Sequence, residues 1–154
     1  MTDMDTEPPS PLLAAKLEIA ESRYREALYL LDRITAHTAE EEAQKLVLSG
    51  QCFEGLNDVA RASEAYSQAR SIAPTVLVSI LRQGVLRYRR GDREGARALL
   101  YRYVELESGN PEAYYYLSLC EQDPLHKAAF VTKLLILDGP TATWSRELFR
   151  SLAQ

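Results

Sequence analysis

The sequence is poor in the residues that build metal centres, disulfide frameworks and catalytic sites. It has only 2 cysteines and 2 histidines, and it contains no paired-histidine motif, no nucleophile elbow and no glycine loop that could hold a phosphate. His37 and His126 are therefore expected at the surface, and Cys52 and Cys120 as buried free thiols. These absences predict a protein that is not an enzyme and that binds no metal or cofactor.

Long apolar runs are also missing. The longest uninterrupted aliphatic stretch, residues 134–137, is far too short to cross a bilayer. Residues 1–10 are acidic and contain prolines, with neither a basic region nor an apolar core, so they predict a disordered lead-in rather than a secretory signal. We expect a cytoplasmic protein without a membrane-inserted segment.

Glycine and proline are scarce, with 7 of each among 154 residues, while 46% of the residues are hydrophobic. This composition excludes a low-complexity chain and supplies enough apolar material for one continuous core. Residues 76–81 are rich in β-branched side chains, but Leu77, Ile80 and Gly84 follow helical spacing. We therefore expect an all-α fold.

What the sequence does contain is a repeat with a period of 34 residues. A unit of this length cannot bury its own apolar face and must stack on its neighbours, so the period predicts a helical solenoid that presents a surface. The equivalent positions are Gly50 and Gly84, Asp58 and Asp92, Ala62 and Ala96, Tyr66 and Leu100, and Ala69 and Tyr103.

Residues 43–76 carry a pattern of small and aromatic side chains closed by a proline, namely Gly50, Phe53, Ala62, Tyr66, Ala69 and Pro74. In this pattern the segment resembles the tetratricopeptide repeat, where a small residue such as Gly50 lets the first helix of a hairpin approach the second. Residues 77–110 resemble a second copy, but Ser108 stands where a proline is expected and the next proline is Pro111. We therefore expect the second helix of that copy to be longer by about one turn.

The resemblance continues less closely on both sides. Residues 111–140 resemble a third repeat and residues 11–40 a degenerate one, while residues 141–154 form an amphipathic segment suited to a C-terminal capping helix. The resemblance therefore implies an α-solenoid of three to four helical hairpins with that cap. Together with the local capping signals, it places helices at residues 11–21, 24–37, 42–55, 58–73, 76–90, 92–107, 111–121, 124–137 and 142–153.

In tetratricopeptide solenoids the first helix of each hairpin lines a concave groove. Most side chains on that face are apolar here, so we expect a helical or extended segment of a protein partner, or another copy of this chain, to cover them. The alternative is that they pack inside a tighter superhelix or under the N-terminal segment. The resemblance implies a groove formed by Val47, Leu48, Gln51, Val78, Leu81, Arg82, Val85, Tyr88, Arg89, Tyr115, Tyr116 and Leu119.

Charge is distributed unevenly along the chain. Its formal net charge is -4, yet residues 1–43 carry ten acidic and four basic side chains, whereas residues 44–110 carry seven acidic and ten basic ones. Arg82 and Arg89 lie two helical turns apart on the expected groove face and could bind an acidic peptide or the acidic N-terminal segment. The negative net charge does not favour nucleic acid as a partner.

These features predict a non-enzymatic protein–protein interaction adaptor or scaffold. Some tetratricopeptide proteins hold the C-terminal carboxylate of heat-shock chaperones with a clamp of lysine, asparagine and arginine. The matching positions here are Val47, Gln51, Leu81 and Val85, which disfavours that role. As an alternative, the chain resembles the small tetratricopeptide chaperones of bacterial type III secretion, which keep a secreted client soluble in an apolar groove.

Overall fold

The computed structural model describes residues 7–139 and 142–154, and this part of the chain folds into nine α-helices without a β-strand. Its all-α, tetratricopeptide-like architecture confirms the expected fold class. Residues 1–6 of the expected lead-in and Pro140 of the third repeat lie outside the described residues. The helices are α1 Pro11–Ala20, α2 Tyr24–Asp32, α3 Ala39–Gly55, α4 Val59–Ile72, α5 Val78–Arg89, α6 Arg93–Leu106, α7 Pro111–Cys120, α8 Pro124–Asp138 and α9 Thr143–Leu152.

Side-chain caps fix the starts of the repeat helices. The Asp58 carboxylate accepts a hydrogen bond from the N–H of Arg61 at 3.1 Å, and Asp92, its equivalent, accepts from Gly95 at 2.9 Å. Asn110 caps α7 in the same way, with proline at the first helical position. The recurrence of a capping aspartate at Asp58 and Asp92 therefore sets the recurrence of α4 and α6.

Two helices differ from the sequence-based expectation in the degenerate repeat. α2 ends at Asp32 rather than at residue 37, and α3 begins three residues earlier than expected. Thr38 explains the early start, because its hydroxyl accepts from the N–H of Glu41 at 3.1 Å while the Glu41 carboxylate accepts from the N–H of His37 at 2.7 Å. This exchange resembles a capping box.

The expected extension of the second helix in residues 77–110 is wrong. α6 has 14 residues, as α4 has, and begins and ends 34 positions later than α4. The chain leaves the helix at Glu107, whose backbone is extended and whose carboxylate accepts the N–H of Gly109 at 3.0 Å. A local turn thus ends α6 without a proline.

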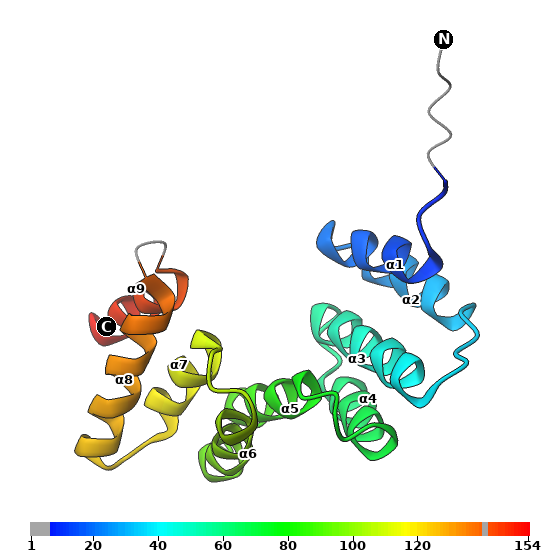
Figure 1. Ribbon diagram of the computed structural model, residues 1–154. Coiled ribbons are helices and arrows are strands. Elements are labelled where there is room, and N and C mark those ends of the chain that lie inside the picture. Colours follow the sequence, from blue (N-terminus) through cyan, green and yellow to red (C-terminus); the bar gives the residue numbers. More distant parts are fainter. Residues whose placement is uncertain (1–6, 140–141) are drawn as a thin grey trace. The chain divides into compact units, whose positions relative to one another are not determined.

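The chain divides into two compact units, Met1–Val76 and Leu77–Gln154. In the first unit α1 packs on α2, α2 on α3, and α3 on α4 (Figure 1). The small side chains Ala15 and Ala27 bring α1 and α2 together, and Leu31, Leu48 and Cys52 complete this part of the core. Close packing of small and aliphatic side chains therefore holds the α1–α2 hairpin against α3.

The second unit consists of the α5–α6 and α7–α8 hairpins and α9 (Figure 1). One apolar cluster runs through all five helices, with Leu81 from α5, Leu100 from α6, Leu117 from α7, Leu134 from α8 and Leu148 from α9. Each of these leucines is at most 2% exposed. α9 is thus part of the core of this unit and covers the last hairpin.

Candidate functional site

The structure buries half of the twelve side chains that were expected to line an open groove. Their burial contradicts the expectation that these six side chains are open to water. Leu48 packs against α1 and α2 in the first unit, and Leu81 and Val85 belong to the cluster that joins α5 to α7. The six buried residues, none more than 9% exposed, are Val47, Leu48, Leu81, Val85, Tyr115 and Tyr116.

The other six of these residues keep part of their surface in solvent. Gln51 belongs to the first unit and the remaining five to the second, so each set is described within its own unit. Val78 and Arg89 are exposed, and Gln51, Arg82, Tyr88 and Leu119 are half-buried. We name the five in the second unit, Val78, Arg82, Tyr88, Arg89 and Leu119, the α5–α7 surface.

Three contacts at two positions fasten α5 to α7 within the α5–α7 surface. The Arg82 guanidinium donates to the carboxylate of Glu112, and both side chains are less than one-fifth exposed. Six residues further along α5, the Tyr88 ring meets the edge of the Tyr116 ring with 5.4 Å between centroids, and Arg89 donates a hydrogen bond to Tyr116. The two helices therefore hold their exposed side chains in a fixed register.

The hydroxyls of Tyr115 and Tyr116 remain protonated at neutral pH. Burial raises the pKa of Tyr116, which nearby Arg89 lowers only in part. Burial likewise raises the pKa of Tyr115. Both side chains can therefore act as hydrogen-bond donors but not as anions.

Trp144 of α9 covers Tyr115 and Tyr116, two of the three buried tyrosines of α7. Its ring centroid lies 5.2 Å from that of Tyr115 and 6.0 Å from that of Tyr116, and Leu148 behind it is 1% exposed. The capping helix thus occupies the position that sequence reasoning assigned to a partner at Tyr115 and Tyr116.

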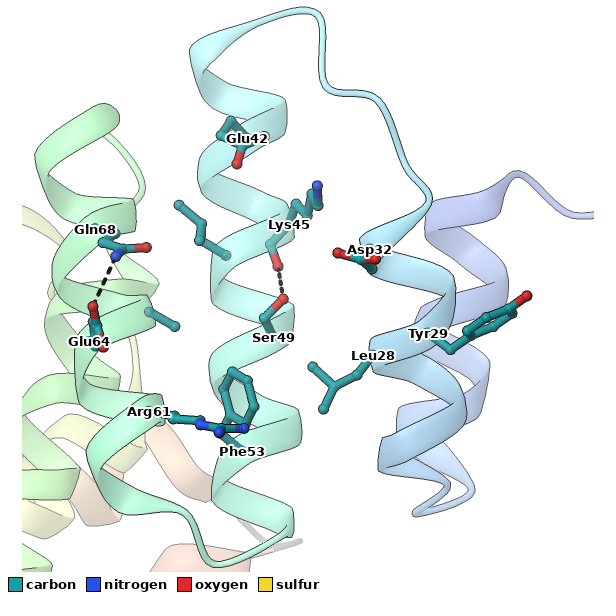
Figure 2. A pocket seen from close by; sticks show the side chains of 12 residues that line it. Leu28, Tyr29, Asp32, Glu42, Lys45, Ser49, Phe53, Arg61, Glu64 and Gln68 are labelled. Carbon is teal, nitrogen blue, oxygen red and sulfur yellow. Dashed lines mark hydrogen bonds between the residues drawn. The ribbon is translucent and has the colours of Figure 1, made fainter.

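The first unit contains a hollow of about 650 Å³ that includes none of the twelve expected residues. α3 forms its floor, and α2 and α4 form its walls (Figure 2). The α3 residues in it lie on the side of the helix opposite to Leu48 and Gln51. We name this hollow the α2–α4 trough; it is lined by Leu28, Tyr29, Asp32, Glu42, Lys45, Leu46, Ser49, Phe53, Arg61, Glu64, Ala65 and Gln68.

A smaller hollow of about 340 Å³ lies on the other side of α3. Leu48 and Gln51 line it together with Ile19 and Ala20 of α1. Two of the expected residues in this unit are therefore brought together beside a hollow, although the Leu48 side chain is 8% exposed.

No group of three or more histidine, cysteine, aspartate or glutamate side chains within the described ranges could hold a metal ion. His37 and His126 are exposed, and His126 Nδ1 lies 3.0 Å from a carboxylate oxygen of Asp123. Among residues 7–139 and 142–154, no helix combines the length and apolar character that a membrane span requires.

The sequence matches no protein-family model and no curated protein. Among solved structures, the chain is similar to two crystal structures of MamA. The first has a TM-score of 0.67 at 14% identity, over 83% of this chain and 71% of that chain. The second has a TM-score of 0.66 at 13% identity, over 93% of this chain and 78% of that chain. It is also similar to the second TPR domain of human RPAP3, determined by NMR in complex with the HSP70 peptide SGPTIEEVD (TM-score 0.63, 19% identity, 74% of this chain and 94% of that one). The chain therefore has the tetratricopeptide-repeat fold that its 34-residue period predicts.

Proposed function

We propose that this chain is a non-enzymatic adaptor that binds a segment of another protein, and that the α5–α7 surface is where it does so. The observation that carries the proposal is the double attachment of α5 to α7, through Arg82 with Glu112 and through Tyr88 and Arg89 with Tyr116. Side chains held in place before binding lose little conformational freedom when a partner docks. Such a surface suits recognition.

The chemistry of the α5–α7 surface favours a segment that combines apolar and acidic side chains. Val78 is 37% exposed and offers aliphatic area at the start of α5, and the exposed Arg89 stands at the end of the same helix. Arg93 adds a second cation, with its guanidinium 6.0 Å from the centre of the Tyr88 ring. An acidic peptide, including an acidic segment of a second copy of this chain, fits these residues.

The fold supports the proposal by analogy, because a domain of the same fold binds a peptide in its solved complex. The secretion-chaperone alternative would use the same kind of surface and stays a prediction. The heat-shock type of carboxylate clamp is not part of the proposal. Leu81 and Val85 stand at two of its positions and are buried.

The test uses the exposed members of the surface. Tyr115→Ala with Leu81→Ala, the pair suggested by the sequence, would open cavities in the core, because both side chains are less than one-tenth exposed. We choose Val78→Ser with Arg89→Ser. A photocrosslinker at Val78 captures the partner in native lysate, mass spectrometry identifies it, and its affinity for the purified chain is then measured.

The double substitution should weaken that affinity by about tenfold or more, since truncating two contact residues typically costs this much. Circular dichroism should show an unchanged fold. Ile136→Ser, a substitution at a 71%-exposed position on α8, is the matched control and should leave the affinity unchanged. Equal binding by the folded double variant and the control would remove the α5–α7 surface from the proposal.

A further inference from the structure

The α2–α4 trough offers a second interaction site on the first unit, of opposite charge to the α5–α7 surface. We propose that it binds a short basic segment of a partner protein, with one apolar side chain inserted as an anchor and lysine or arginine on either side of it. The shape of the trough, its apolar floor and the pairing of its charges favour such a ligand.

The shape follows from how three helices pack. α2 and α4 each pack on α3, and the space between their outer halves stays open above α3 (Figure 2). The α3 residues that line the trough run from Glu42 to Phe53, which corresponds to about 16 Å along the helix axis. A segment of three helical turns, or an extended one of about five residues, has this length.

The centre of the trough is apolar. Leu46 and Phe53 rise from α3, Leu28 faces them from α2, and Ala65 closes the α4 side. A volume of about 650 Å³ lies within the usual range of ligand sites, about 300–1,000 Å³. The trough can therefore take up a side chain the size of leucine or phenylalanine, as partner grooves for amphipathic helices do.

The two cations that line the trough are engaged within the fold. Lys45 Nζ donates to the carbonyl oxygen of Ile34 at 3.1 Å and so ties α3 to the loop after α2. The Arg61 guanidinium lies over the Phe53 ring at 5.7 Å, with its Nε atom 3.5 Å from the Asp58 carboxylate. The charge of Arg61 is thus partly offset by Asp58, whereas Lys45 keeps its charge but is tied to the loop, and the lining still holds three carboxylates against two cations.

The three carboxylates of the trough have no cationic partner in the described part of the chain. Asp32 on α2 and Glu42 on α3 make no hydrogen bond or ion pair with any other described residue, and Glu64 on α4 accepts only from the uncharged amide of Gln68, at 3.3 Å (Figure 2). The floor and the two walls of the trough thus each contribute a carboxylate without a cationic partner among the described residues. A cation on a docked segment would have three acceptors within the site.

The net negative charge of the whole first unit also favours a basic ligand. Residues 1–76 carry 13 acidic and 7 basic side chains. Arg33, next to Asp32, is turned onto the Tyr29 ring, with its guanidinium 5.1 Å from the ring centre. The unit therefore attracts cationic segments over a distance of about a Debye length, and the trough selects among them by its shape.

The test uses two synthetic peptides of twelve residues, the length of residues 42–53. Both have the same leucine and alanine positions, and they differ only in carrying lysine or glutamate at the remaining positions. Binding of each labelled peptide to the full chain is measured by fluorescence anisotropy. The lysine peptide should bind about tenfold or more tightly than the glutamate peptide, as expected for three charge contacts at a partly desolvated site.

Two variants locate the binding. Ser49→Trp adds a ring to the floor of the trough and should abolish most of the binding. Asp32→Asn with Glu42→Gln and Glu64→Gln should weaken it by about tenfold, roughly twofold for each contact. The matched control, Glu7→Gln with Glu21→Gln and Glu40→Gln, removes the same charge from exposed positions of the same unit and should have a much smaller effect.

Three results would overturn the proposal. If both peptides bind with equal affinity, charge does not decide binding. If the triple substitution in the trough and the triple control substitution weaken binding of the lysine peptide equally, the peptide responds to the net charge of the unit and not to a site. Sedimentation that shows the chain pairing with itself through the trough assigns the site to a second copy instead. The outcome is independent of the α5–α7 experiment, because the variants of the two tests lie in different units.

Discussion

Gly50 leaves room for the ring of Tyr66. A Cβ atom built at Gly50 lies 2.5 Å from Cε1 of that ring, which is far closer than atoms in contact can be. Tyr66 cannot give way easily, because it is fully buried and its hydroxyl donates to the Glu54 carboxylate. The approach of α3 to α4 thus depends on the absence of a side chain at one position.

Gly50→Ala should therefore lower the stability of the protein. Overpacking costs about 1–3 kcal/mol, and the better helix propensity of alanine offsets about 1 kcal/mol of this, so we expect a net loss of up to about 2 kcal/mol in urea denaturation. Gln44→Ala, on the exposed side of the same helix, has no such clash and should be neutral or slightly stabilising. Equal effects of the two substitutions would contradict the close approach.

The residues that fix the fold are those that sequence reasoning could find. Gly50 recurs as Gly84 and Asp58 as Asp92, while Leu100 takes the place of Tyr66, because each position has a local task, closing a helix pair or starting a helix. Thr38 and Glu41 also carry a readable signal, the capping box, which accounts for the early start of α3. These features need no knowledge of distant parts of the chain.

The exposure of the first helices could not be predicted in the same way. Tyr115 and Tyr116 occupy the expected face of α7, but Trp144 from outside the repeats covers them. The α2–α4 trough has no sequence signal at all, because Leu28, Phe53 and Ala65 become its lining only through the spacing of three packed helices. Whether a helix face is open is decided by its neighbours, and a period does not contain that information.

Glu121 makes the stability of the second unit dependent on pH. Its side chain is 7% exposed, and its carboxylate accepts the N–H of Asp123 at 3.1 Å, the N–H of Gln122 at 2.9 Å and the Tyr101 hydroxyl at 2.9 Å. The pKa of Glu121 therefore lies below its ordinary value in spite of burial. The hydrogen bond from Asp123 lowers it most, followed by the bonds from Tyr101 and Gln122 and by the charge of Arg97. The folded state therefore favours the charged form.

The lowered pKa of Glu121 determines how the stability of the protein changes with pH. Stability from a carboxyl group with a lowered pKa is fully present above the ordinary glutamate pKa of about 4.3 and is lost as the pH falls through the folded-state pKa. Glu121→Gln should cost about 1–3 kcal/mol at neutral pH, because buried donors lose a charged acceptor. The difference from the unsubstituted protein should narrow in acid. Glu105→Gln, on the exposed side of α6, controls for the loss of one charge.

Cys52 and Cys120 should be unreactive in the native protein. Both thiols are buried, with exposures of 0% and 3%, and burial raises the pKa of each to about 11. At pH 8 only about one thiol in a thousand would be ionised, and the thiolate is the nucleophile. A chromogenic disulfide reagent should therefore label neither cysteine before unfolding.

Variants that keep a single cysteine allow the opening of each unit to be measured separately. With Cys120→Ala the reagent reports on the opening of the first unit, and with Cys52→Ala on that of the second. Ser71→Cys, placed at an exposed position of α4, is the positive control and should react at once. Rapid labelling of Cys52 or Cys120 in the folded chain would show that the thiol is accessible after all.

Leu148 holds the capping helix on the second unit, and the single tryptophan of the chain reports on it. Leu148→Ala leaves a cavity behind α9 at a position that is 1% exposed, so it should lower the stability by about 2–5 kcal/mol. Because the Trp144 ring rests on Tyr115, loosening α9 should also move its fluorescence to longer wavelength before the main unfolding transition. Leu152→Ala removes the same atoms from a 63%-exposed position on the same helix and should change stability by less than about 0.5 kcal/mol. An unchanged spectrum for Leu148→Ala would mean that α9 is not held by this contact.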